Sequence, residues 1–210
     1  VQRAALPASG VLDVVVDVVQ SAQQGALHLN FGGASLEESI EIRIAGADGV
    51  EELSFISGAT MQTLGVAIRQ LTPLTGVTAV AGESGLTLRS VGLGDRAFVS
   101  VRVTHDPGWT PSSPLMGGYR MLASDAETPD PGTLVPFGQT SGALQIGDVG
   151  QDIRGLVNGG WVTGQGTWMW VERPRLRARI DLADGELGPG MTVNGQNLGR
   201  FRAFRVVRVP

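Results

Sequence analysis

The sequence predicts an α+β fold that is predominantly β, with antiparallel sheets and one amphipathic helix. Three observations support this prediction. The 210-residue chain contains 31 glycines, which indicate frequent turns. Short segments in which apolar and polar residues alternate recur along the chain, as expected of strands with one buried face. One segment, at about residues 60–72, instead has apolar residues at helical spacing.

Four strands are expected before the helix. In the first, VLDVVVDVV, the aspartates Asp13 and Asp17 share one face and the apolar residues share the other. A later segment alternates isoleucine with charged residues and continues through Asp48–Gly49, a hairpin turn signal. The four expected strands are residues 11–19, 26–31, 39–45 and 51–56.

The expected helix follows at residues 60–72. Thr60 is a suitable N-cap, and Pro73 would end the helix within two residues of its last apolar position. Its apolar residues recur at i, i+3, i+7 and i+10, which places them on one helical face. These residues are Met61, Leu64, Ile68 and Leu71.

The strand pattern resumes after the helix and defines the expected domains. Strands at 77–81, 86–90 and 97–104 complete a compact α+β domain over residues 11–105, preceded by a linker at 1–10. Residues 106–143 contain six prolines and form an expected excursion or loop. Residues 144–210 form a second β-rich unit, with turn signals at Asn158–Gly159 and Asn194–Gly195. Its expected strands are 152–157, 161–163, 167–171, 175–182 and 200–209.

Composition excludes several kinds of chemistry. The chain has no cysteine, so it has no disulfide, thiolate ligand or cysteine nucleophile. All 16 basic residues are arginine, so no lysine is available as a Schiff base or general base. The net charge of −4 does not indicate a nucleic-acid partner, and no apolar run has the length of a membrane helix. No signal peptide is visible, and the loop-like start at Val1 leads us to expect a fragment of a longer protein.

No catalytic, cofactor or metal site is predicted, and we expect no enzymatic activity. His28 and His105 lack the spacing of a metal-binding motif. Two groups of carboxylates could in principle form a glycosidase acid pair, but they lie at turns or on a polar strand face. These groups are Glu37, Glu38 and Glu41, and Asp48, Glu51 and Glu52. An oxygen-rich loop, which we interpret as solvated rather than calcium-binding, contains Asp125, Glu127 and Asp130.

Tryptophan and arginine residues in the second unit form the most unusual pattern. Trp168 and Trp170 alternate in one expected strand, so their rings share a sheet face. We expect them to fill a core or an interdomain contact; a sugar-stacking surface is the alternative. Four arginines alternate in residues 173–179, and we interpret them as a solvated strand face that opposes edge aggregation. An acidic partner or a polyanion is the alternative ligand for Arg173, Arg175, Arg177 and Arg179.

The stretch from Ser35 to Thr104 resembles the hook IN motif of flagellins and flagellar hook-associated proteins. In that motif a β-hairpin leads through a turn into an amphipathic helix, and three strands follow. Upstream, residues 12–36 resemble the entry into the same region, and residues 148–166 resemble an element that often follows the motif. The corresponding turn and strands here are Gly58–Thr60, Gly76–Ala79, Leu86–Leu88 and Phe98–Val101.

This resemblance covers about two thirds of the chain, although Arg69–Gln70 replaces the usual Ile-Asn and the tryptophans are additions. It implies an extracellular structural module of the bacterial flagellum, the surface-exposed central region of a flagellin-like filament protein. Neighbouring subunits would be its partners through terminal regions absent here, so the isolated chain should be monomeric. One alternative is a fragment of a hook-associated or capping protein. Another is a carbohydrate-binding or adhesin module with Trp109, Trp168 and Trp170 as contact residues.

Overall fold

The computed structural model confirms the predicted fold class. It describes residues 3–6, 8–9, 11–122, 128–138, 142–182, 192–193, 196–197 and 199–207. Within these residues the chain is mostly antiparallel β-sheet, and the one helix longer than a single turn is α1, Met61–Gln70. The predicted helix at residues 60–72 therefore lies where the apolar spacing placed it.

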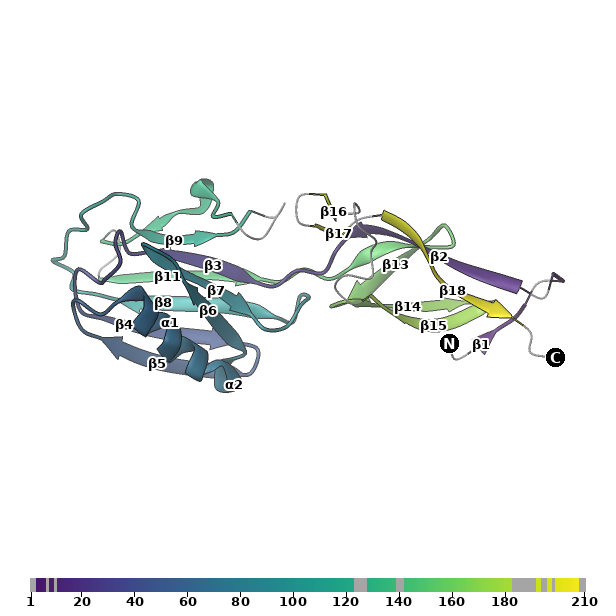
Figure 1. Ribbon diagram of the computed structural model, residues 1–210, viewed down its shortest axis with the longest axis horizontal. Coiled ribbons are helices and arrows are strands. Elements are labelled where there is room, and N and C mark those ends of the chain that lie inside the picture. Colours follow the sequence, from purple (N-terminus) through teal and green to yellow (C-terminus); the bar gives the residue numbers. More distant parts are fainter. Residues whose placement is uncertain are drawn as a thin grey trace. The chain divides into compact units, whose positions relative to one another are not determined.

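The chain divides into two units, and the second is inserted into the first (Figure 1). Unit 1 contains Val1–Gln23 and Gln151–Pro210, and unit 2 contains Gln24–Gly150. Gln23 and Gln151 form an antiparallel bridge in which each backbone N–H donates to the other's carbonyl, at 2.8 and 3.0 Å. The two segments that connect the units are thus adjacent, although 127 residues separate them in the sequence.

Unit 2 contains a five-stranded and a four-stranded antiparallel sheet that share one hydrophobic core. The five-stranded sheet has the order β10-β9-β3-β7-β6, and the four-stranded sheet has the order β11-β8-β4-β5. The first sheet contains β3 (Ala26–Asn30), β6 (Val77–Ala81), β7 (Gly85–Ser90), β9 (Gly117–Arg120) and β10 (Val135–Pro136). The second contains β4 (Ile40–Gly46), β5 (Gly49–Phe55), β8 (Phe98–Thr104) and β11 (Ala143–Val149).

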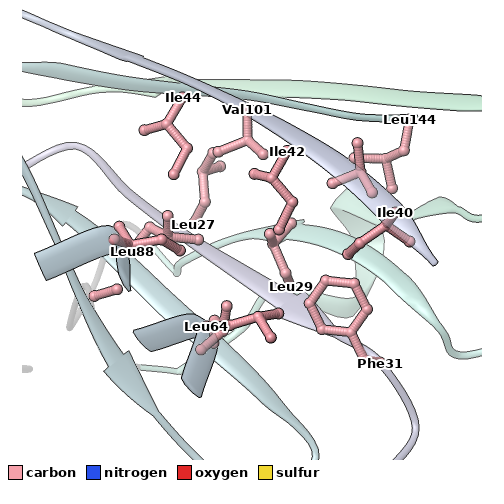
Figure 2. Close-up of a cluster of buried hydrophobic side chains, with 14 of the residues drawn as sticks. Leu27, Leu29, Phe31, Ile40, Ile42, Ile44, Leu64, Leu88, Val101 and Leu144 are labelled. Carbon is pink, nitrogen blue, oxygen red and sulfur yellow. The ribbon is translucent and has the colours of Figure 1, made fainter. Parts of the chain in front are cut away.

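Alternation along these strands builds the core of unit 2. In β4 the isoleucines at every second position are buried, while Glu41 and Arg43 between them are exposed. Figure 2 shows the isoleucines of β4 directed towards side chains of β3, β7 and α1. Burial of these aliphatic side chains is the main stabilising contribution of the unit. The residues labelled there are Leu27, Leu29, Phe31, Ile40, Ile42, Ile44, Leu64, Leu88, Val101 and Leu144.

Helix α1 has local signals at both ends. The Thr60 hydroxyl accepts a hydrogen bond from the Thr63 N–H at 3.2 Å, as an N-cap does. Pro73 follows the end of α1 and lies in the first turn of a second, short helix, α2 (Thr72–Thr75). This helix ends at Gly76, which has a φ of 70°. Arg69 donates through Nη1 to the Ala79 carbonyl of the edge strand β6 at 2.8 Å. The helix therefore covers one exposed edge of the five-stranded sheet.

The proline-rich residues 106–143 belong to unit 2. They contain β9, the 3₁₀ helix η1 (Pro131–Thr133) and β10, and β9 pairs with β3 in the five-stranded sheet. The sequence pattern did not reveal β9 because its residues are Gly-Gly-Tyr-Arg. Gly118 faces the core, where a Cβ would lie 2.9 Å from Ile146 Cγ2, so the position requires glycine.

Unit 1 contains a seven-stranded sheet of order β1-β15-β14-β13-β12-β2-β18. The apolar residues of its inner face form a separate core, which includes Val14, Val16, Met169 and Ala178. A two-residue turn, Asn158–Gly159, joins β12 to β13 with φ values of 47° and 76°. The strands are β1 (Arg3–Ala4), β2 (Val11–Gln20), β12 (Arg154–Val157), β13 (Gly160–Gln165), β14 (Trp168–Arg173), β15 (Leu176–Asp181) and β18 (Gly199–Val207).

The observed units differ from the domains expected over residues 11–105 and 144–210. Strand β2 was expected to belong with the strands that follow it, but it pairs with β12 and β18 of unit 1. Likewise β11, expected in the second unit, pairs with β8 of unit 2. Local alternation identifies a strand without identifying its partner, and here the partners are distant in sequence. The expected turn at Asn194–Gly195 lies outside the described residues, between β16 (Thr192–Val193) and β17 (Gln196–Asn197).

We predict that Ile68→Asp destabilises unit 2 much more than Gln62→Asp does. Ile68 is completely buried, so the aspartate would place an unpaired charge in the core at a cost of several kcal/mol. Gln62 is exposed on the same helix, and its replacement should cost less than about 1 kcal/mol. Urea unfolding curves of the two variants measure this difference, and equal shifts of the midpoint would contradict the assigned buried face.

Candidate functional site

The hairpin β14–β15 presents a distinctive outer face in unit 1. Met169 and Val171 of β14 point into the core, so Trp168 and Trp170 point outward. The partner strand buries Leu176, Ala178 and Ile180 and exposes the residues between them. The register places each outward residue of one strand opposite an outward residue of the other. These cross-strand pairs are Trp168 with Asp181, Trp170 with Arg179, and Glu172 with Arg177.

Arginine and tryptophan side chains stack along this face. The Arg179 guanidinium carbon lies 4.7 Å from the centre of the Trp168 ring, and that of Arg177 lies 5.7 Å from the centre of the Trp170 ring. Both distances suit cation–π attraction. Arg179 also donates through Nη2 and Nε to Asp181 Oδ1 at 2.9 and 3.1 Å, and Arg177 Nε lies 3.5 Å from Glu172 Oε1. The stack therefore fixes the orientation of side chains that would otherwise be mobile.

The expectation that Trp168 and Trp170 fill a core is wrong. Both rings are half-buried and belong to the face opposite the core of unit 1. The prediction that they share one face is confirmed, but the smaller side chains Met169 and Val171 occupy the inner positions. The arginines of β15 stack on both rings and cover part of them. The sequence contained a signal for this arrangement, because the two-residue turn at Pro174–Arg175 sets which residues of β14 and β15 lie opposite each other.

Trp161 adds a third indole to the same outer face. It lies on β13, its neighbour Val162 packs against the core, and 65% of its surface is exposed. We use the name tryptophan–arginine face for the surface that carries Trp161, Trp168, Trp170, Arg177 and Arg179. An exposed indole beside ordered arginines has the composition of protein contact surfaces, in which tryptophan and arginine are enriched.

Two further arginines lie at the end of this hairpin. Arg173 donates through Nη2 to the Trp161 carbonyl at 3.1 Å and passes over Gly160, where a Cβ would lie only 2.5 Å from Nη2. Arg175 is exposed in the turn. Within the described part of the chain neither arginine forms an ion pair. Both border a pocket of about 410 Å³ whose other lining residues are Leu12, Val157, Asn158, Gly159, Gly160, Val171 and Leu176.

Trp109, the third tryptophan proposed for sugar contact, lies in unit 2 and so belongs to a different cluster. It packs against His105 and Phe137, with ring centres 5.3 and 5.5 Å away. His105 is buried, its Nδ1 lies 3.0 Å from the Asp106 carbonyl, and its Nε2 accepts from the Gly138 N–H at 3.4 Å. These contacts hold the ring as part of the packing.

His28, the other histidine, lies on the outer face of the five-stranded sheet. Its Nδ1 is 3.2 Å from Thr87 Oγ1, and its ring centre is 6.3 Å from that of Tyr119. Burial lowers the pKa of His28 below its ordinary value. Burial also raises the pKa of Tyr119, and a hydrogen bond with Asn30 partly offsets this by lowering it. The His28 ring is partly buried and the Tyr119 ring is buried among neighbouring residues of the sheet, so we interpret both as structural residues.

Glu37, Glu38 and Glu41, the first candidate group for a glycosidase acid pair, do not line a common cleft among the described residues. Glu38 accepts a hydrogen bond from the Asp106 backbone N–H at 2.6 Å, and Glu37 accepts one from the Ser112 N–H at 3.3 Å. Glu41 is exposed on β4, opposite Ser54 of β5. Glu37 and Glu38 therefore connect loops that are distant in sequence.

The second group and the calcium candidates are also dispersed. Glu51 and Glu52 follow one another on β5 and so point to opposite faces of the sheet, and Asp48 lies in the preceding turn. Asp130 is the N-cap of η1 and accepts from the Gly132 N–H at 2.9 Å. Asp125 and Glu127 lie outside the described residues. Among the residues that are described, no three His, Asp or Glu side chains are grouped to hold a metal ion.

A hollow of about 650 Å³ lies in unit 2. Arg120 lines it and donates through Nε to the Gly147 carbonyl at 2.9 Å. The remaining described lining residues are neutral, so the hollow offers no paired acid and base. They are Ser100, Thr133, Val135, Gln145, Ile146 and Gly147.

Comparison with known proteins gives a distant structural likeness. No protein-family model matches the chain, and no curated protein matches it. The chain is similar to a solved structure described as the crystal structure of the flagellar cap protein FliD from Bdellovibrio bacteriovorus. The two share 13% sequence identity and a TM-score of 0.45 over 82% of this chain and 88% of that one. A likeness at this level decides neither the family nor the function of the chain.

None of the described helices has both the length and the apolar character needed to cross a bilayer.

We predict that Trp168→Ala and Trp170→Ala each cost less stability than Met169→Ala. Met169 is completely buried, so its truncation should cost about 2–5 kcal/mol. Each outward tryptophan would lose a stacked arginine, worth about 0.5–1 kcal/mol at an exposed site, and only part of its apolar burial. Urea unfolding of the three variants gives the comparison. Tryptophan variants as unstable as Met169→Ala would show that the rings belong to the core.

Proposed function

We propose that the chain is a non-enzymatic structural module of a bacterial flagellar filament protein, the surface-exposed central region of a flagellin-like subunit. The observation that carries this proposal is the order of elements over residues 39–104. The resemblance to the hook IN motif calls for a hairpin, a turn, an amphipathic helix and three strands. Unit 2 contains these elements in that order and packs them around one core.

The individual motif residues have the structural roles that such a fold requires. Gly58 has a φ of 82°, and Thr60 two residues later caps α1, so the turn leads directly into the helix. Gly76 has a φ of 70° and ends α2 immediately before β6. Leu86 and Leu88 of β7 are buried in the same core as α1. The resemblance thus rests on residues that form the fold, which supports a common architecture.

The candidate residues also support a structural function over a catalytic one. The His105 ring is buried as part of the packing, and Glu37 and Glu38 accept backbone hydrogen bonds that hold loops together. The outward tryptophans are stacked by arginines on β15, which disfavours a sugar platform because stacking needs open ring faces. We place the module outside the cell, with neighbouring filament subunits as its partners through segments beyond this chain. The isolated chain should then be monomeric at micromolar concentrations.

A hook-associated or capping protein remains the alternative because the hook IN motif occurs in those proteins too. The two proposals differ in position along the flagellum and in the number of copies. A filament protein is present along the whole length, whereas a hook-associated or capping protein occurs at a junction or at the tip.

We predict that antibodies raised against this 210-residue chain label flagella along their length. Immunogold electron microscopy of cells that produce the full-length protein measures the distribution. Cells that lack the gene are the control. Label at the tip or at the hook–filament junction would favour the alternative, and label on the cell body alone would exclude both flagellar proposals in favour of an adhesin.

A further inference from the structure

Charge is divided unequally between the two units. Unit 2 contains 13 Asp and Glu against 6 Arg, which gives a net charge of −7. Unit 1 contains 7 Asp and Glu against 10 Arg, which gives +3, and together they account for the −4 of the chain. A molecule with oppositely charged units attracts further copies of itself in a head-to-tail sense.

One end of unit 2 collects acidic groups without a cation. Loops 32–39, 56–60 and 105–116 meet there, connected by the hydrogen bonds from Ser112 and Asp106 to Glu37 and Glu38 and from Gly58 N–H to the Leu36 carbonyl. None of these three segments contains an arginine. We call this surface the acidic end, defined by Glu37, Glu38, Asp106, Ile56 and Leu115.

Two exposed apolar side chains accompany these acids. Ile56 is 76% exposed and Leu115 is 61% exposed, and together with Trp161 at 65% they are the three most exposed large hydrophobic residues in the described part of the chain. Ile56 is next to Ser57, whose hydroxyl donates to the Glu37 carbonyl at 3.0 Å. Leu115 is held by Tyr119 and Asn30, which both donate to its carbonyl. Exposed apolar residues on ordered loops are typical of contact sites.

The tryptophan–arginine face of unit 1 is complementary in apolar character, and unit 1 is positively charged. Arg177 and Arg179 of the face pair with Glu172 and Asp181, so its unpaired charge comes from Arg175, which is exposed in the hairpin turn and has no ion-pair partner among the described residues. Arg173 follows Met169 and Val171 on the inner side of β14 and is not part of the face. The arginines of the stack are already ordered by Trp168, Trp170 and two carboxylates, so little side-chain entropy would be lost on contact.

We propose that the tryptophan–arginine face of one copy docks the acidic end of unit 2 of a neighbouring copy. This inference rests on the proposed function, because a filament holds many copies close together. The contact is heterologous: each copy uses a different surface from the one it meets, and each can have two neighbours. A few exposed residues on each side make a small interface, so the isolated chain is monomeric at micromolar concentration and associates only when concentrated.

A second copy fits these observations better than a polysaccharide does. The stacked arginines occupy ring surface of Trp168 and Trp170 that sugars would need. A polysaccharide would also leave the two most exposed aliphatic side chains, on the acidic end, without a role. Docking of a second copy covers Trp161, Ile56 and Leu115 in a single contact.

Sedimentation velocity of the intact chain at increasing concentration tests the proposal. Association should be measurable at about 0.01 M salt and lost at about 1 M, since the Debye length falls from about 30 Å to about 3 Å. Trp161→Ala and Arg175→Glu should each weaken association by about tenfold or more, as central contact residues do. Both residues are exposed, so folding should be preserved, and circular dichroism checks this. Arg102→Glu is the matched control, because it changes the net charge equally on an exposed position of unit 2.

Mixing two defective variants tests whether the contact is heterologous. Trp161→Ala leaves the acidic end intact, and Ile56→Ser leaves the tryptophan–arginine face intact. Each variant alone should stay monomeric, whereas an equimolar mixture should form dimers and nothing larger, because one working pair of surfaces remains. Dimers in neither the variants nor the mixture, with a self-associating wild type, would overturn the pairing.

Three other outcomes would also overturn the proposal. These are no association of the wild-type chain at millimolar concentration, an equal loss for Arg175→Glu and Arg102→Glu, or shifts of the tryptophan indole NMR signals with an acidic oligosaccharide but not with chain concentration. The last outcome would assign the face to a glycan. None of them depends on where antibodies label the flagellum, so this proposal can fail while the proposed function stands.

Discussion

The pairing of β2 with β18 is the constraint on which unit 1 depends. β2 lies between β12 and β18, so a strand from the start of the chain joins two strands from its second half. Without β2 the sheet would be divided, and the core of unit 1 would lose Val14, Val16 and Val18. Closing so long a loop has an entropic cost that grows slowly with loop length. The bridge between Gln23 and Gln151 holds together the two ends of the segment that lies between β2 and β12 in the sequence.

The same rule of alternation produces both the cores and the surfaces. In β4 it buries isoleucine and exposes Glu41 and Arg43, and the face between the sheets becomes a continuous aliphatic core. In β14 it buries Met169 and Val171 and leaves two indoles outside. The arginines of β15 stack on these two indoles because the register sets them alongside. The aromatic cluster around His105 is the contrasting case, in which loops rather than strands enclose the rings.

Features of the fold that depend on residues close together in the sequence could be predicted, whereas features that depend on distant residues could not. Helix α1 could be predicted because its cap, its apolar spacing and Pro73 lie within 14 residues. The shared face of Trp168 and Trp170 could also be predicted, since it needs only the period of a strand. The direction of that face could not, because it depends on how β14 packs against β2 and β12 in the folded unit. Strand β9 was missed for a different reason. Close packing requires a glycine at Gly118, and a glycine at an inward position removes the alternation of apolar and polar residues by which a strand is recognised.

The adjacency of the two connecting segments has a consequence for how such proteins diversify. Because the chain leaves and re-enters unit 1 at the bridged residues Gln23 and Gln151, unit 2 occupies the topological place of a hairpin loop. A hairpin loop tolerates changes of length and sequence as long as its ends stay close. An entire unit can therefore be enlarged, shortened or exchanged by recombination at one point of the fold. The unit that holds the inserted one keeps its strands in register through such a change.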